Sequence, residues 1–154
     1  MPELTKQAES AVANLLESDE DQLYEQLGIV AQAMGSNPSV SASFQPEVTY
    51  TEAAMGPMDD VRELGKRIFR RWNKEAHKLV CGSEDIDEKD RDKLRQAFGF
   101  GEVTVAGVLT GLLVTQFGLA PAIAAVLAAL IAKRFFRPAY DEFCEFWKEK
   151  LPQT

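Results

Sequence analysis

An uncharged run of thirty residues, 103–132, constrains the fold more than any other feature of this sequence. Glu102 precedes the run, and two basic residues follow it. In a chain of 154 residues, such a run must form the middle of the core or lie in a membrane. The run contains Gly118 and Pro121; proline removes a helical hydrogen bond and glycine eases a bend. We therefore predict two short antiparallel helices, 103–117 and 119–136, joined by a tight turn.

Both predicted helices gather small residues on one face when they are placed on the helical period of 3.6 residues. Bulky side chains take the opposite face, and small faces let helix backbones approach closely, in lipid or in a soluble core. We therefore predict that the two helices pack against each other through small residues. The residues of this predicted helix-packing set are Gly107, Gly111, Thr115, Ala120, Ala124, Ala128 and Ala132.

The environment of this hairpin has two interpretations. The mean hydropathy of residues 112–130 is roughly 2, the strength expected of a membrane-spanning helix. The length argues the other way, because each uncharged arm is only about 21–23 Å long and a bilayer core is about 30 Å thick. Gln116 also falls on the bulky face of the first arm, where an amide is disfavoured in lipid. A buried hairpin is the favoured interpretation, and permanent residence in a membrane is the alternative.

The remaining segments predict one all-α domain over residues 1–154. Apolar spacing predicts a helical hairpin within 1–34, with an N-cap at Ser18-Asp19. A long irregular connection over 35–57 follows, either a surface linker or a binding loop, with a weak strand pattern at 40–44 and 48–51. We expect a compact bundle of about six or seven helices around the central hairpin. Its other helices are a basic and a charged helix within 58–98 and an amphipathic helix within 138–151.

Two groups of cationic residues stand out in this acidic chain. One side of the long helix predicted after Pro57 is basic, either as a solvated face or as a contact for anionic lipid. Aromatic and basic residues also follow the apolar run, either as core packing with an exposed rim or as an anchor at a membrane interface. The predicted contact residues are Lys66, Arg67, Arg70, Arg71 and Lys74 on the helix, and Lys133, Arg134, Phe135, Phe136 and Arg137 after the run.

Several functional classes lack support in the sequence. The net charge of −7 disfavours general nucleic-acid binding. The chain begins without a secretory signal pattern, so the cytoplasm is the expected compartment, with or without membrane association. Cys81 and Cys144 are too few for a disulfide framework and are expected to be buried free thiols. His77 has no second histidine or nearby cysteine for a metal site. We therefore predict no catalytic, cofactor or metal site, and no small-molecule substrate.

These observations favour a small non-enzymatic helical protein that acts through its apolar hairpin. Conditional membrane association or insertion, or oligomerisation, is the first hypothesis. The alternative is a soluble helical adaptor or subunit whose hairpin is a buried core or a permanent protein–protein interface. The general plan is similar to that of colicin-type pore-forming domains, which also bury a hydrophobic helical hairpin. The similarity is one of architecture alone.

Overall fold

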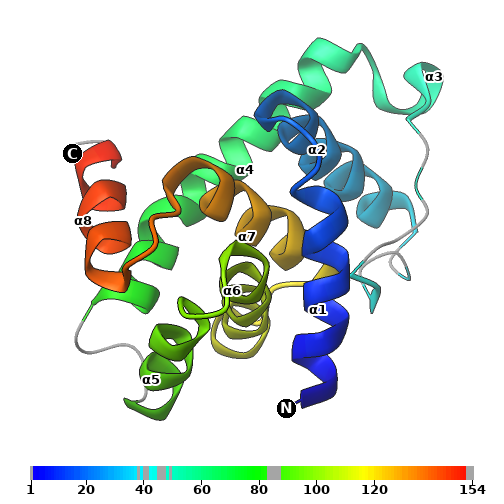
Figure 1. The fold of residues 1–154 in the computed structure, drawn as a ribbon. Helices are drawn as coiled ribbons and strands as arrows, with labels where there is room; N and C mark the ends of the chain where they lie inside the picture. The colour runs from blue at the N-terminus through cyan, green and yellow to red at the C-terminus, as the bar shows by residue number, and fades with distance from the viewer. Residues whose placement is uncertain are drawn as a thin grey trace.

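The computed structural model describes residues 2–37, 39, 42–44, 48, 50–82 and 88–151. This part of the chain is all-α, which confirms the predicted fold class (Figure 1). It holds seven helices of ten or more residues and the single-turn helix α3, with no strand among the described residues. The helices are α1 Pro2–Leu15, α2 Glu20–Ser36, α3 Glu52–Met55, α4 Met58–Cys81, α5 Glu88–Ala97, α6 Glu102–Phe117, α7 Pro121–Phe135 and α8 Tyr140–Lys150.

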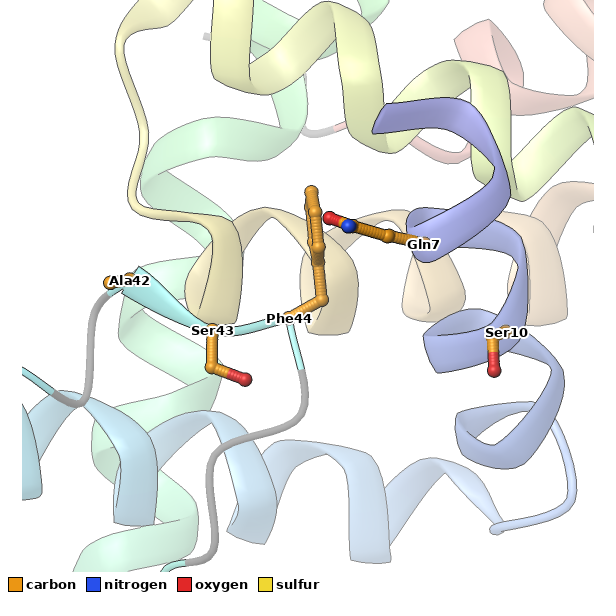
Figure 2. Close-up of a pocket in the computed structure, with 5 residues that line it drawn as sticks. All are labelled: Gln7, Ser10, Ala42, Ser43 and Phe44. Atoms are coloured by element: carbon orange, nitrogen blue, oxygen red, sulfur yellow. The ribbon is translucent and has the colours of Figure 1, made fainter. Parts of the chain in front are cut away.

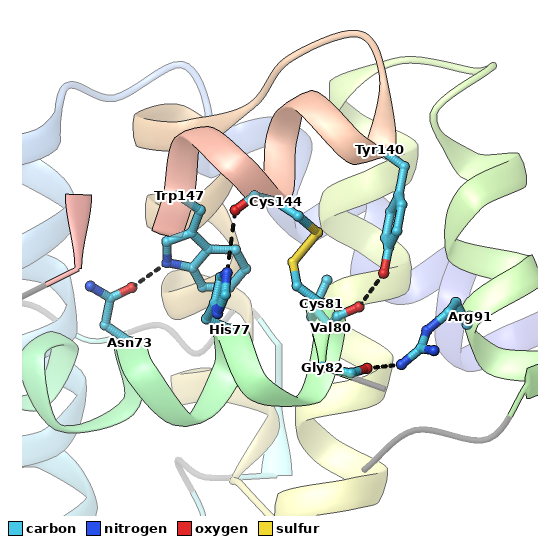
Figure 3. The surroundings of a disulfide bond; sticks show 9 residues. All are labelled: Asn73, His77, Val80, Cys81, Gly82, Arg91, Tyr140, Cys144 and Trp147. Atoms are coloured by element: carbon cyan, nitrogen blue, oxygen red, sulfur yellow. Dashed lines mark hydrogen bonds between the residues drawn. A yellow bond between two sulfur atoms is a disulfide. The ribbon is translucent and has the colours of Figure 1, made fainter. Parts of the chain in front are cut away.

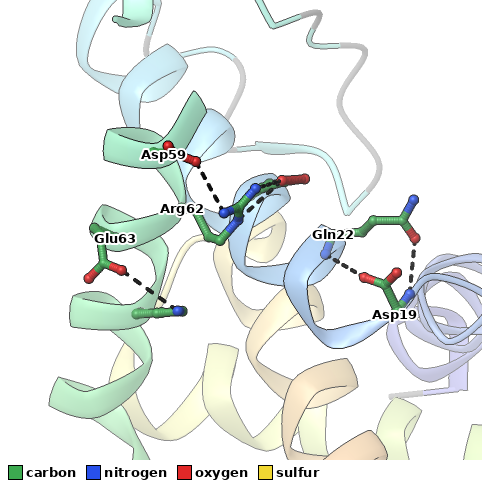
Figure 4. Close-up of polar contacts among 7 residues, drawn as sticks. Asp19, Gln22, Asp59, Arg62 and Glu63 are labelled. Carbon is green, nitrogen blue, oxygen red and sulfur yellow. Dashed lines mark hydrogen bonds and ion pairs between the residues drawn. The ribbon is translucent and has the colours of Figure 1, made fainter. Parts of the chain in front are cut away.

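The helix boundaries follow local signals in the sequence. Asp19 caps α2: its carboxylate accepts a hydrogen bond from the Gln22 backbone at 2.8 Å (Figure 4). In return, the Gln22 side chain accepts one from the Asp19 backbone at 3.0 Å, which completes a capping box. Gly118 ends α6 in the left-handed conformation (φ 66°), and Pro121 is the first residue of α7. The predicted break in the apolar run is therefore where one helix ends and the next begins.

Helix α7 lies in the middle of the molecule, packed against α1, α2, α6 and α8 (Figure 1). Residues 122–132 of α7 are buried without exception, because the helix is apolar on all sides and is covered on all sides. On α6, residues 105–110 are buried as well. Within the described part of the chain, no helix combines the length and the apolar character needed to cross a membrane.

Small residues bring three helices together at the side of α7. A β-carbon added at Gly107 of α6 would meet Glu9 of α1, so this part of α6 faces α1. Beside it, alanines of α1, α6 and α7 form a small apolar cluster of their own. The members of this small-residue cluster are Ala11, Val12, Ala106, Ala125 and Ala132. Gly107 and Ala132 of the predicted packing set therefore lie where α1 meets α6 and α7.

Another close helix contact, between α2 and α4, was not predicted. Gly28 of α2 lies against the backbone of Val61, and Gly65 of α4 lies against the backbone of Tyr24. A β-carbon at either glycine would overlap the facing carbonyl oxygen. Glycine is therefore required at both positions by the close approach of two backbones, and this contact fixes how α4 lies on the bundle.

The connection over residues 35–57 is described in part. Phe44 packs against the small-residue cluster, and α3 forms one helical turn before α4. The hydroxyl of Tyr50 donates a hydrogen bond to the carbonyl of Gly56 at 2.6 Å. Residues 40, 41 and 49 of the weak strand pattern lie outside the described residues. The connection therefore packs on the helices at Phe44, and the hydrogen bond of Tyr50 closes a turn within the connection.

Candidate functional site

The exposed side of α4 carries a row of cations, which we name the basic face. Five side chains that share one side of the helix are exposed along about three turns, a length of about 16 Å. The opposite side of α4 is buried in the core, at Val61, Phe69 and Leu79 among others. The bundle therefore holds the basic face in a fixed position. Its residues are Arg67, Arg70, Arg71, Lys74 and Lys78.

The beginning of α4 is acidic, and its cations pair with nearby carboxylates. Arg62 pairs with Glu25 of α2 at 2.6 Å and with Asp59 at 3.2 Å (Figure 4). Lys66 pairs with Glu63 at 3.6 Å and lies 5.9 Å from the centre of the Tyr24 ring. The predicted contact residue Lys66 therefore belongs to the flank of the helix that faces α2.

The predicted contact residues after the apolar run contact several different parts of the bundle. The guanidinium of Arg134 donates to the Tyr24 hydroxyl at 2.6 Å and lies over the Phe69 ring. Burial raises the pKa of Tyr24, although the charge of Arg134 acts in the opposite direction. Lys133 is exposed and donates to the carbonyl of Leu16 at 3.0 Å. Both cations thus secure the contact of α7 with the N-terminal helices.

The aromatic residues at this point belong to the core. Phe135 is 1% exposed and stacks on Trp147 of α8 with ring centres 5.5 Å apart. Phe136 is partly buried and stacks on Phe98 at 5.8 Å. Arg137 is exposed and covers the Phe146 ring at 3.8 Å. Phe135 therefore packs in the core, Phe136 is partly buried and Arg137 is exposed.

The predicted helix-packing residues are divided between core and surface. Ala124, Ala128 and Ala132 are fully buried on α7, as is Gly107 on α6. Ala120 and Gly111 are partly buried. Thr115 is exposed, and its hydroxyl donates to the carbonyl of Gly111 at 3.0 Å. The last turn of α6 is therefore open to solvent on the side where the sequence predicted a helix contact.

The two cysteines form a disulfide bond, and the prediction of free thiols is wrong. Cys81 at the end of α4 and Cys144 in α8 are joined across 63 positions of sequence, with their Cα atoms 5.7 Å apart (Figure 3). The segment between them contains α5, α6 and α7. Disulfides are typical of oxidising compartments.

Hydrogen bonds and stacked rings surround the disulfide. The indole N–H of Trp147 donates to the side-chain oxygen of Asn73 at 2.7 Å, and both residues are buried (Figure 3). The Tyr140 hydroxyl donates to the carbonyl of Val80 at 2.5 Å. These contacts hold α8 on α4 on either side of the disulfide. Sequence reasoning missed Asn73, although a single amide on the apolar side of a helix is a signal for a buried hydrogen bond.

His77 of α4 contacts two residues of α8. Its Nε2 atom lies 3.3 Å from the carbonyl oxygen of Cys144, and its ring meets the edge of Trp147 at 5.1 Å between ring centres. Burial lowers the pKa of His77; the hydrogen bond to the Cys144 carbonyl opposes this shift, and the charge of Lys148 adds to it. His77 is therefore a packing residue between α4 and α8.

A cavity of about 500 Å³ opens beside the disulfide. Two arginines of α5 and two carboxylates of α8 line it together with both cysteines. Arg91 donates a hydrogen bond to the carbonyl of Gly82 (Figure 3), and the guanidinium of Arg95 lies 5.0 Å from the Tyr140 ring. Burial raises the pKa of Tyr140. The described residues that line this disulfide cavity are Cys81, Arg91, Arg95, Tyr140, Asp141, Cys144 and Glu145.

Phe44 lines two further hollows beside α1. The larger, about 510 Å³, lies between α1 and residues 42–44, and Figure 2 shows the Phe44 ring next to the Gln7 side chain. The smaller, about 250 Å³, lies between α1, α2 and α7 and is lined by Leu15, Val30 and Val126 among others. Among the described residues, no charged side chain lines either hollow.

Comparison with known proteins gives no family to which the site could be referred. No family model, no curated protein and no solved structure matches this chain.

Proposed function

We propose that the protein is a non-enzymatic binding module that docks on an anionic membrane surface through the basic face of α4. The observation that carries this proposal is the row of five exposed cations on a helix whose other side is fixed in the core. Anionic lipid attracts a basic residue near the surface by about 1 kcal/mol. A row of five such residues on a rigid helix meets a flat anionic surface without a change of conformation.

The charge of the rest of the molecule sets the orientation of the docked protein. Removing these five cations from the net charge of −7 leaves −12 on the remaining chain. An anionic surface repels that remainder, so the protein approaches with α4 toward the lipid. At 0.1 M salt, interactions between exposed charges more than about 10 Å apart are largely screened, and this distance shortens as the salt concentration rises. Docking is therefore weaker at higher ionic strength.

In this proposal, the α6–α7 hairpin stays in the core of the docked protein. The burial of residues 122–132 on α7 supports this role, because an inserted hairpin would first have to lose its contacts with α1, α2 and α8. Docking through α4 needs no such opening. The hairpin thus supplies the scaffold, and the basic face supplies the contact.

Vesicle binding tests the proposal. The triple variant Arg67→Gln/Arg70→Gln/Arg71→Gln is compared with a control of equal charge, Lys6→Gln/Lys148→Gln/Lys150→Gln, whose residues are also exposed. We expect the first variant to bind phosphatidylserine-containing vesicles roughly 100-fold more weakly than the wild-type protein, from about 1 kcal/mol per cation. The control should lose far less, because its residues lie outside the basic face.

Two results would overturn the proposal. The first is a wild-type protein that stays in the supernatant with anionic vesicles at low salt. The second is an equal loss of binding in both triple variants, which would make net charge the determinant. Release of a trapped dye from the vesicles, which we do not expect, would instead support insertion of the hairpin.

A further inference from the structure

Among the described residues, two arginines and two carboxylates line the disulfide cavity together with the Cys81–Cys144 bond. Both cysteines line it and both are partly exposed, so a small molecule in the cavity reaches the bond. Arg91 and Arg95 come from α5, whereas Asp141 and Glu145 come from α8. A volume of about 500 Å³ is in the range of small-molecule sites, which is about 300–1,000 Å³.

We propose that this cavity binds a small zwitterionic thiol, of the amino-acid or short-peptide type, which exchanges with the Cys81–Cys144 disulfide. The carboxylate of such a thiol pairs with the arginines of α5, and its ammonium group pairs with the carboxylates of α8. Charge-assisted hydrogen bonds of this kind are about twice as strong as neutral ones. A thiol of a single charge would find one pair of partners and be repelled by the other pair.

The exchange is a displacement at sulfur. The thiolate of the ligand attacks Sγ of Cys81, a new S–S bond forms there, and the bond to Cys144 breaks with its electron pair moving to Sγ of Cys144. The released thiolate takes a proton from water. The reverse attack by Cys144 on Sγ of Cys81 restores the protein disulfide and expels the ligand, so no other oxidant or reductant is needed.

The surroundings of the two sulfur atoms decide the direction of attack. Cys81 is the last residue of α4, where the helix carries partial negative charge that disfavours a thiolate. Cys144 follows Tyr140 by one turn of α8 and shares its side of the helix, and Arg95 lies over the Tyr140 ring. The departing thiolate is therefore better stabilised at Cys144, and the mixed disulfide forms at Cys81.

Three thiols that differ in charge test the proposal on the oxidised full-length protein. They are free L-cysteine (zwitterionic), cysteamine (cationic) and 3-mercaptopropionate (anionic). Each rate is divided by the rate of the same thiol with hydroxyethyl disulfide, which removes differences in intrinsic reactivity. The reactions are quenched with iodoacetamide. We expect the normalised rate of L-cysteine to be about tenfold higher than those of the other two thiols. Peptide mass mapping should find the ligand on Cys81 and the alkyl group on Cys144.

Charge variants of the cavity sharpen the test. Arg95→Gln should shift the preference toward cysteamine, and Glu145→Gln should shift it toward 3-mercaptopropionate. Lys148→Gln and Glu149→Gln lie on α8 outside the lining and should keep the wild-type preference. Equal normalised rates for the three thiols, a ligand found on Cys144, or the absence of any mixed disulfide would each overturn the proposal.

Discussion

Removal of the disulfide should destabilise the protein by about 4 kcal/mol. The bond closes a segment of 63 residues. In the chain-entropy model, a closed loop of that length removes about 14 cal/mol/K from the unfolded state, or about 4 kcal/mol at 25 °C. For a domain of this size, each kcal/mol shifts the melting temperature by about 2–4 °C. We therefore expect the melting temperature to fall by roughly 8–16 °C.

This estimate applies if the native structure survives without the bond, and the contacts around α8 make that the expected outcome. Trp147 keeps its hydrogen bond to Asn73 and its stacking on Phe135, and Tyr140 keeps its bond to the Val80 carbonyl. With these contacts in place, the lost stability comes from the greater freedom of the unfolded chain, and the native far-UV circular dichroism spectrum should be unchanged.

Urea unfolding of Cys81→Ser/Cys144→Ser beside the oxidised wild-type protein measures the difference. At typical slopes for small proteins, about 4 kcal/mol moves the midpoint down by roughly 2 M. A reducing agent should reproduce the shift in the wild-type protein and leave the double variant unchanged. A difference below about 1 kcal/mol, at the low end of what disulfides contribute, would refute the claim that this bond constrains the chain.

Three further substitutions test the packing of α4 against α2 and α8. Gly65→Ala should be strongly destabilising, because its β-carbon would overlap the Tyr24 carbonyl, whereas Gly35→Ala has open space and should be close to neutral. Similar urea midpoints for the two variants would contradict the close approach of α2 and α4. Asn73→Ala should cost about 1–3 kcal/mol by leaving the buried Trp147 N–H without an acceptor, measured by thermal melting, and an unchanged melting temperature would show that this hydrogen bond is dispensable. Burial lowers the pKa of His77 in the folded state, so the unfolded state binds the proton more readily. The contribution of His77 to stability should therefore be fully present above about pH 6.5, and it should be lost as the pH falls from there through the lowered folded-state pKa. His77→Gln should remove this part of the pH dependence in urea titrations between pH 5 and pH 8, and an identical pH profile in the variant would assign the dependence to other groups.

The sequence predicted the features that depend on near neighbours in the chain. Asp19 directly precedes the residues that form α2, and its type alone predicts an N-cap there. Gly118 and Pro121 likewise predict the end of one helix and the start of the next.

The features that the sequence did not predict depend on contacts between distant segments. Nothing local distinguishes a cysteine that pairs across 63 positions from a free one. The same is true of Gly65, which is an ordinary weak point of a helix until the backbone of α2 is placed against it. Phe135 is next to a basic residue, as an interfacial anchor would be, and only its stacking on Trp147 identifies it as core.

The basic face was identified from sequence in outline. The periodicity of α4 placed Arg67, Arg70, Arg71 and Lys74 on one side, and all four are exposed. The sequence could not separate Lys66 from this group, because its contact with Tyr24 depends on where α2 lies. The disulfide cavity was missed altogether, since its walls come from α5 and α8 and meet through tertiary packing.

Hydrogen–deuterium exchange with and without phosphatidylserine-containing vesicles tests the central claim most directly, namely that α4 carries the contact while the hairpin remains the core. We predict that the amides of α7 are among the slowest to exchange in both conditions, because the buried core opens last. Vesicles should slow exchange along residues 66–78 of α4 and leave α1 and α8 unchanged. Faster exchange in α1 and α8 on vesicle binding would show that these helices leave the hairpin, and it would contradict the account.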